Sequence, residues 1–224
     1  MASRRKLEGV YLVTSPKRPV SRLLGIVEES LKGGTALVQF RDKGDFTETE
    51  RTAALIELVE TSRRFRVPLL VNDDPRLAAR FRADGVHIGR EDPSAAEARA
   101  LLGPRAIVGV TVYGGKDEER RAADAGADYV AAGPFFPSPT KPEEPVMDVE
   151  VLDRIVGRSA LPVFAIGGIT APRARELAGH GVAGVAVVSA IMDAADPRRA
   201  TADIVRAFAG GQRGLRDAPR GRKA

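Results

Sequence analysis

The segment VFAIGGITAPRARELAGHGVAGVAVV spans residues 163–188 and decides how the chain folds. Two short apolar runs, Val163–Ile166 and Val182–Val188, flank a helix-like stretch at Ala171–Ala178. A strand, a helix and a further strand in this order are typical of parallel pairing. The runs are apolar almost without interruption, as expected for parallel strands that are buried on both faces.

The same alternation continues along the whole chain. Each apolar run is followed by a helix-like stretch, such as Thr49–Arg64. The eight runs are Val10–Val13, Ala36–Phe40, Pro68–Val71, Gly85–Ile88, Ile107–Val110, Tyr129–Ala132, Val163–Ile166 and Val182–Val188. Eight such units in about 200 residues predict a single TIM-type (β/α)₈ barrel. An open doubly wound sheet remains compatible with the periodicity alone.

Helix starts and the domain boundary can also be predicted. Asp74-Pro75, Asp92-Pro93 and Asp196-Pro197 each place a carboxylate before a proline, a typical start of a helix. No linker precedes about residue 210, so we expect a catalytic barrel domain over residues 1–208. Residues 209–224 are expected to form a basic, disordered C-terminal tail.

Composition excludes several kinds of site. The chain has no cysteine and two histidines, which excludes disulfides, thiolate metal sites and an ordinary structural zinc site. A hard cation such as Mg²⁺, held by carboxylates, stays possible. Met1–Lys6 is polar, Val10–Val13 is too short for a signal core, and no run reaches the length of a membrane span. We therefore expect a cytoplasmic protein without a membrane partner.

The positive charge of the chain lies at its two ends. The net charge is +5, yet residues 212–224 carry five cationic side chains against Asp217, and Arg4, Arg5 and Lys6 add three more. The barrel itself is therefore close to neutral. Basic ends can bind polyanions, but we favour a solvated, disordered extension, and no nucleic-acid partner is expected.

The segment after the run at 36–40 is cationic. Gln39, Arg41 and Lys43 lie on one side of an extended strand, because side chains alternate between its two faces. A guanidinium and an ammonium group suit the oxygens of a phosphorylated ligand. A polar strand end facing solvent is the alternative.

Carboxylates follow the next two runs. Asn72 and Asp73 end one, and Asp92 lies shortly after His87 at the end of the other. Two carboxylates at neighbouring strand ends are what Mg²⁺ requires, with waters and substrate phosphates completing its shell. Asp92 could equally cap a helix, whereas for Asp74 we favour the cap. For His87 we favour a hydrogen-bonded core residue over a catalytic one.

Three later loops suit phosphate. Residues 133–141 form a long loop that contains Ser138, Thr140 and Lys141, although a purely solvated loop is the alternative. Gly168 and Ser189 follow the last two runs, where barrels of this kind build a phosphate-binding cup from backbone N–H groups. A cup and a separate cationic segment together indicate two phosphorylated substrates.

In this order and spacing, the segments from about Tyr11 to Asp193 resemble the thiamine-phosphate synthases. The resemblance implies a Mg²⁺-dependent transferase that joins hydroxymethylpyrimidine diphosphate to hydroxyethylthiazole phosphate and releases pyrophosphate. No protein nucleophile is then needed, and catalysis consists mainly of positioning and electrostatic stabilisation. The oligomeric state stays open, a homo-oligomer included.

The resemblance also implies roles for individual residues. Asp73 and Asp92 match the Mg²⁺ ligands. The residues that match the pyrimidine diphosphate site are Gln39, Arg41, Lys43, Asn72, Thr111 and Lys141, of which Arg41, Lys43 and Lys141 are the expected catalytic cations. The residues that match the thiazole phosphate site are Ser138, Thr140, Gly168, Val188 and Ser189.

The chain departs from the family pattern at two places, and two other functions compete. Tyr113 stands where the family often has a histidine, and residues 143–147 stand where it usually has a glycine. The related thiazole tautomerases typically carry a histidine where this chain has Pro134. A phosphate sensor without activity would not need the carboxylates Asp73 and Asp92. Both observations favour the synthase.

Overall fold

The computed structural model describes residues 6–15, 19–137 and 145–217. Within these ranges, eight parallel strands form a closed barrel in which β1 pairs with β8. The strands are β1 (Gly9–Val13), β2 (Leu37–Phe40), β3 (Leu69–Asn72), β4 (Gly85–Ile88), β5 (Ile107–Val112), β6 (Tyr129–Ala132), β7 (Val163–Ile166) and β8 (Gly184–Val187). The predicted TIM-type barrel is confirmed, and the β1–β8 pairing excludes an open sheet.

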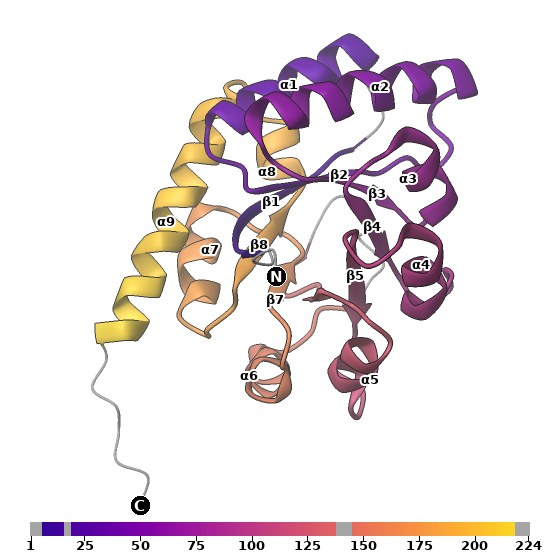
Figure 1. Ribbon diagram of the computed structural model, residues 1–224. Coiled ribbons are helices and arrows are strands. Elements are labelled where there is room, and N and C mark those ends of the chain that lie inside the picture. Colours follow the sequence, from indigo (N-terminus) through magenta and orange to yellow (C-terminus); the bar gives the residue numbers. More distant parts are fainter. Residues whose placement is uncertain (1–5, 16–18, 138–144, 218–224) are drawn as a thin grey trace, which may run out of the picture.

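The helices form a ring outside the strands (Figure 1). They are α1 (Val20–Lys32), α2 (Glu48–Phe65), α3 (Pro75–Phe81), α4 (Ala95–Leu102), α5 (Glu118–Asp124), α6 (Val149–Arg158), α7 (Ala171–Ala178), α8 (Ser189–Met192) and α9 (Pro197–Asp217). Strand residues such as Val10 and Leu12 pack outward against them in the main apolar layer. Among the described residues, no helix has both the length and the apolar composition that a membrane span requires.

The carboxylates that precede a proline differ in their roles. Asp74 caps α3, where its Oδ1 accepts hydrogen bonds from the N–H groups of Arg76 and Leu77 at 2.8 and 2.9 Å. The helix start predicted at Asp92-Pro93 is wrong, because α4 begins two residues later, at Ala95, with Ser94 as its N-cap. Ser94 and Glu97 form a capping box, which satisfies two backbone N–H groups at once. Asp92 is therefore left for another role.

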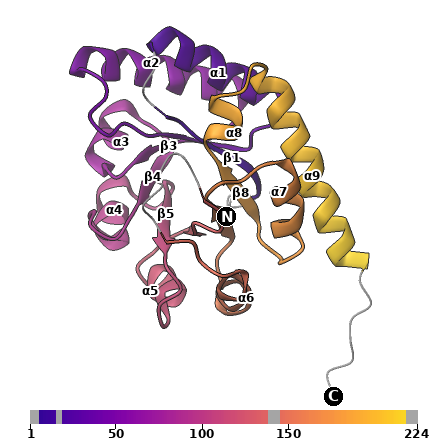
Figure 2. The ribbon, with the colours of Figure 1, turned by 180° about the vertical axis from the view of Figure 1, so that it is seen from behind.

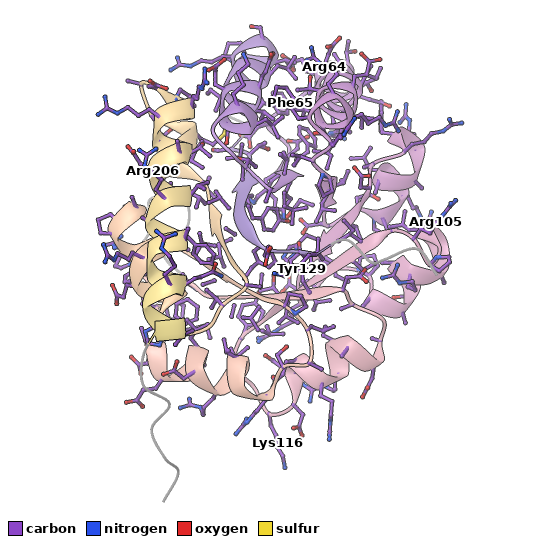
Figure 3. All side chains as sticks on the ribbon, turned by 60° about the vertical axis from the view of Figure 1, so that its left-hand side comes forward. Arg64, Phe65, Arg105, Lys116, Tyr129 and Arg206 are labelled. Carbon is purple, nitrogen blue, oxygen red and sulfur yellow. The ribbon has the colours of Figure 1, made fainter. Side chains whose placement is uncertain are left out.

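Three aromatic rings fill the inside of the barrel. Tyr11, Tyr129 and Phe164 meet edge to face, with ring centroids 5.2 to 5.9 Å apart. Glycines on adjacent strands leave room for them, since a Cβ on Gly109 would lie 2.1 Å from the Tyr129 ring and one on Gly184 would lie 2.3 Å from Phe164. Figure 3 shows Tyr129 at the centre of the molecule. Large and small residues thus alternate to close the interior without a pore.

Helix α9 runs along the outside of the barrel against α1 and α7, as Figures 1 and 2 both show. It continues to Asp217, so the boundary expected at residue 208 is corrected: residues 209–217 are helical. Gly211 explains the continuation, because its lack of a side chain lets α9 approach the backbone of α7 at Arg175. Residues 218–224 lie outside the described residues, and the tail there stays a prediction.

Two glycines of α9 test this docking. A Cβ on Gly211 would lie 2.1 Å from the Arg175 carbonyl oxygen, whereas one on Gly214 would meet nothing within 4 Å. We expect Gly211→Ala to lower the free energy of unfolding by about 1–3 kcal/mol through overpacking. We expect Gly214→Ala to raise it by up to about 1 kcal/mol, since alanine favours the helix. Urea unfolding measures both, and an equal gain from both variants would contradict the docking of residues 209–217.

Candidate active site

A cavity of about 490 Å³ opens at the carboxyl ends of the strands. Residues from β1 to the start of α8 contribute to its walls, because all strands of a parallel barrel end at the same rim. The predicted site residues that line it are Gln39, Arg41, Lys43, Asn72, Asp73, Asp92, Thr111, Gly168, Val188 and Ser189. Ser138, Thr140 and Lys141 lie outside the described residues.

The cationic segment after β2 faces the cavity with alternate residues. Gln39, Arg41 and Lys43 all line the cavity. The intervening Asp42 turns away and pairs with Arg51 of α2 at 2.7 Å. The Arg41 backbone N–H donates to Thr14 Oγ1 at 2.9 Å, which fixes the turn that leaves the strand. The predicted alternation is therefore confirmed.

Asp73 and Asp92 form a carboxylate pair beside Lys43. Lys43 Nζ lies 2.5 Å from Asp73 Oδ2, and Asp92 Oδ2 accepts a hydrogen bond from the Gly89 N–H at 2.7 Å. Burial raises the pKa of Asp92, and the neighbouring Asp73 carboxylate raises it further, against the hydrogen bond from Gly89. The Asp92 carboxylate, which ionises less readily beside Asp73, fits a divalent cation, whose charge would favour its ionised form.

Asp73 has an unusual backbone conformation. Its φ is 65°, a left-handed conformation that aspartate tolerates better than most residues. Its N–H donates to the carbonyl oxygen of His87 at 2.8 Å and so ties the end of β3 to β4. Among the described residues, no group of three or more histidine, aspartate or glutamate side chains could hold a metal by itself. A cation at Asp73 and Asp92 would therefore need further oxygens, which Mg²⁺ takes from phosphates and water.

Asn72 brings a donor without a partner. Its Nδ2 is buried and makes no hydrogen bond with any residue that the structure describes. Leaving such a donor unpaired costs about 1–3 kcal/mol. Asn72 lines the cavity, so an acceptor on a bound ligand can satisfy it.

The glycine pair after β7 packs against the loop that follows β6. A Cβ on Gly168, at φ 61°, would lie 2.5 Å from the carbonyl oxygen of Pro137. Arg173 of α7 donates to the Gly168 carbonyl oxygen at 2.6 Å and stacks on the Phe136 ring at 4.5 Å. The glycine is therefore needed for loop packing, a reason that the sequence did not indicate. Its close approach to an anion stays a prediction.

A buried polar chain lies at the inner end of the cavity, and the sequence analysis missed most of it. Tyr11 and Tyr129 stand inside apolar runs, so the sequence did not indicate them for the site, although a buried tyrosine hydroxyl needs a partner. His87 is buried and hydrogen-bonded, as predicted, with Nδ1 2.9 Å from the Tyr129 hydroxyl and Nε2 2.9 Å from Thr111 Oγ1. It also lines the cavity. Burial lowers the pKa of His87 to about 4, so its ring is neutral at pH 7.

Of the two departures from the family pattern, Tyr113 lines the cavity, whereas residues 143 and 144 lie outside the described residues. The Arg90 guanidinium stacks over the Tyr113 ring at 4.3 Å, and both residues line the cavity. The Tyr113 N–H donates to Glu118 at 2.6 Å. Of residues 143–147, Met147 donates its N–H to the Pro134 carbonyl oxygen at 2.7 Å and so anchors the returning end of the loop.

A model of the family described as thiamine monophosphate synthase matches residues 10–191 of the chain. The chain belongs to the thiamine monophosphate synthase family. The resemblance noted in the sequence is thereby confirmed. The carboxylate pair Asp73 and Asp92 and the cationic segment that contains Arg41 and Lys43 line the same cavity of this barrel.

Individual relatives agree with the family. The chain is 52% identical over 202 residues to a thiamine-phosphate synthase of Thiobacillus denitrificans, covering 90% of this chain and 95% of the relative. It is 34% identical, with a TM-score of 0.80, to the solved thiamine phosphate pyrophosphorylase of Pyrococcus furiosus, covering 93% and 98% of the two chains. A solved 3-hexulose-6-phosphate synthase shares the fold alone, at 16% identity, a TM-score of 0.65 and coverage of 90% and 100%.

The buried His87 predicts how stability depends on pH. The unfolded chain takes up a proton at the ordinary pKa of 6.5, whereas the folded chain resists protonation until about pH 4. Stability is therefore lost as the pH falls from 6.5 toward 4, by about 2 kcal/mol at pH 5. Urea unfolding at pH 7 and pH 5 measures the loss, and His87→Gln should lack this component. The same loss in both proteins would contradict the assignment.

Proposed function

We propose that this member of the family condenses hydroxymethylpyrimidine diphosphate with hydroxyethylthiazole phosphate to give thiamine phosphate and pyrophosphate. The observation that carries the proposal is one cavity that brings cations, a carboxylate pair and a glycine turn to the same barrel mouth. The identity of 52% to a thiamine-phosphate synthase supports it. No described feature favours a tautomerase, and Pro134 occupies the position of the histidine typical of those enzymes.

The diphosphate is proposed to lie along the strand ends of β2 to β5. Arg41 and Lys43 supply positive charge there, and Thr111 supplies a hydroxyl. The unpaired amide of Asn72 supplies a donor that a phosphoryl oxygen would satisfy. These groups stabilise the charge that builds on the leaving diphosphate more strongly than they stabilise the intact substrate, which is how they lower the barrier.

Asp73 and Asp92 are proposed to hold Mg²⁺. When bound, Mg²⁺ would draw charge from diphosphate oxygens as a Lewis acid. Lys43 contacts Asp73 directly, so the ammonium group can hold this carboxylate in place and also reach the diphosphate. The buried, neutral ring of His87 adds no positive charge that would compete for the carboxylates.

The thiazole phosphate is proposed to bind at Gly168, Val188 and Ser189, where loops after β7 and β8 meet the start of α8. Backbone N–H groups in such loops suit a phosphate dianion. The roles of Ser138 and Thr140 at the thiazole phosphate and of Lys141 at the diphosphate stay predictions, as do a cytoplasmic location and a homo-oligomer.

Bond making and breaking then need little from the protein beyond placement. The bond between the pyrimidine methylene carbon and the diphosphate oxygen breaks, and the electron-rich aminopyrimidine stabilises the positive charge on that carbon. The thiazole ring nitrogen attacks the same carbon and forms the new C–N bond. Two substrates held in one cavity of about 490 Å³ gain mainly from proximity.

Pyrophosphate release tests the reaction directly. With both substrates and Mg²⁺, the protein should release pyrophosphate and thiamine phosphate in equal amounts, and omission of either substrate should abolish the signal. Arg41→Ala should lower kcat/KM for the pyrimidine diphosphate about tenfold to a hundredfold, through loss of charge-assisted hydrogen bonds. Arg105→Ala is the matched control, because Arg105 is exposed at the periphery (Figure 3). Release that does not depend on the thiazole would contradict a synthase.

Variants of Asp92 and Ser94 distinguish a metal ligand from a helix cap. Asp92→Asn should raise the Mg²⁺ concentration for half-maximal activity at least about tenfold, because a neutral amide is a poor ligand for a hard cation. Ser94→Ala should instead lower the free energy of unfolding by about 1 kcal/mol through loss of the α4 cap and leave the Mg²⁺ requirement unchanged. An Asp92→Asn protein with lower stability and an unchanged Mg²⁺ requirement would overturn the assignment.

A further inference from the structure

A path of hydrogen bonds crosses the inside of the barrel and ends on a cavity-lining hydroxyl. The Gln39 amide Nε2 donates to the Tyr11 hydroxyl at 2.5 Å, and the hydroxyls of Tyr11 and Tyr129 are 2.9 Å apart. The path continues over 2.9 Å from Tyr129 to His87 Nδ1 and over 2.9 Å from His87 Nε2 to Thr111 Oγ1. Side chains from β1, β2, β4, β5 and β6 are thereby connected.

Burial makes this path self-contained. Tyr129 is fully buried and lies at the centre of the molecule in Figure 3, and Tyr11, Gln39 and His87 are buried as well. A buried polar proton must find its acceptor among its neighbours, since an unpaired one is costly. The protons along the path can therefore be assigned by counting donors and acceptors.

The count gives the path one direction. The Tyr11 oxygen already accepts from Gln39, so its own proton goes to Tyr129. Tyr129 then donates to Nδ1 of His87, and a neutral ring that accepts at Nδ1 carries its proton at Nε2. This Nε2–H donates to Thr111. In the opposite direction, Gln39 and Tyr129 would both donate to Tyr11, whose own proton would have no acceptor on the path.

We propose that Tyr129 is a positioning residue for the reaction, because through His87 it makes the Thr111 hydroxyl a donor toward the cavity. Thr111 Oγ1 accepts from His87, so its own proton must point elsewhere, and the side chain lines the cavity. This inference rests on the proposed function, since a diphosphate offers acceptors only. The same path binds Gln39 Nε2 to Tyr11, which leaves the amide oxygen of Gln39 for the ligand.

Tyr129 and Thr111 differ in how they reach the substrate. Thr111 lines the cavity, whereas Tyr129 is completely buried behind it and is not among the lining residues. Removing the Tyr129 hydroxyl leaves Nδ1 of His87 without a donor. The ring can then take its proton at Nδ1, and Thr111 can donate to Nε2 instead of to the substrate. Tyr129 therefore reaches the substrate through other side chains, and the proposed route runs through His87 and Thr111.

The proton position on His87 can be read by ¹⁵N NMR of the histidine-labelled protein without substrates. The chain has two histidines, so a His180→Gln background leaves one imidazole signal. We expect the Nε2–H tautomer in this background and a mixture of tautomers, or Nδ1–H, in Tyr129→Phe. Tyr11→Phe is the matched control, because Tyr129 keeps its proton and the Nε2–H tautomer should persist. An Nδ1–H ring with Tyr129 intact, or an unchanged tautomer in Tyr129→Phe, would overturn the proposal.

Kinetics tests the consequence for the substrate. Thr111→Ala should lower kcat/KM for the pyrimidine diphosphate about tenfold or more, and Tyr129→Phe about threefold to tenfold, with KM for the thiazole phosphate unchanged. The double variant should be no worse than Thr111→Ala alone, because Tyr129 acts through Thr111. Losses that multiply in the double variant would contradict this, provided that thermal melting shows each variant folded. A wild-type protein that forms no thiamine phosphate would instead refute the proposed function and leave the NMR result standing.

Discussion

The pairing of β1 with β8 closes the sheet, and the whole site depends on that closure. In a closed parallel barrel, every strand ends at the same rim, so residues separated widely in sequence reach one cavity. Gln39 on β2 and Ser189 after β8 line the same cavity in this way. An open sheet would place β1 and β8 apart and would divide the two proposed anion sites between different regions of the surface.

Closure also requires the interior to be filled, and the filling shapes the chemistry. Tyr11, Tyr129 and Phe164 pack together inside the strands, but the two tyrosines bring hydroxyls into the buried interior. Those hydroxyls are paired with Gln39 and His87, which reach the cavity. The packing of the core and the polarity of the cavity wall are therefore coupled in this barrel. Removal of either tyrosine hydroxyl changes a core residue and also a hydrogen bond to a cavity-lining side chain.

Much of this arrangement could be predicted from the sequence, because strand periodicity and strand ends are local signals. The apolar runs located the strands, and polar residues placed after them, such as Lys43 and Asp73, line the cavity as expected. Signals that depend on tertiary packing could not be read. Tyr129 looks like any apolar strand residue until its neighbours are known. The sequence after residue 208 looks solvated, yet residues 209–217 are helical, and Gly211 lets them dock against α7.

The central claim is that one barrel mouth holds two separate anions at once. A crystal structure of the protein with thiamine phosphate, pyrophosphate and Mg²⁺ tests it most directly. The account predicts pyrophosphate and Mg²⁺ beside Arg41, Asp73 and Asp92, with the phosphate of the product at Gly168 and Ser189. A pyrophosphate bound outside this cavity, or both anions sharing the Gly168 loop, would contradict it.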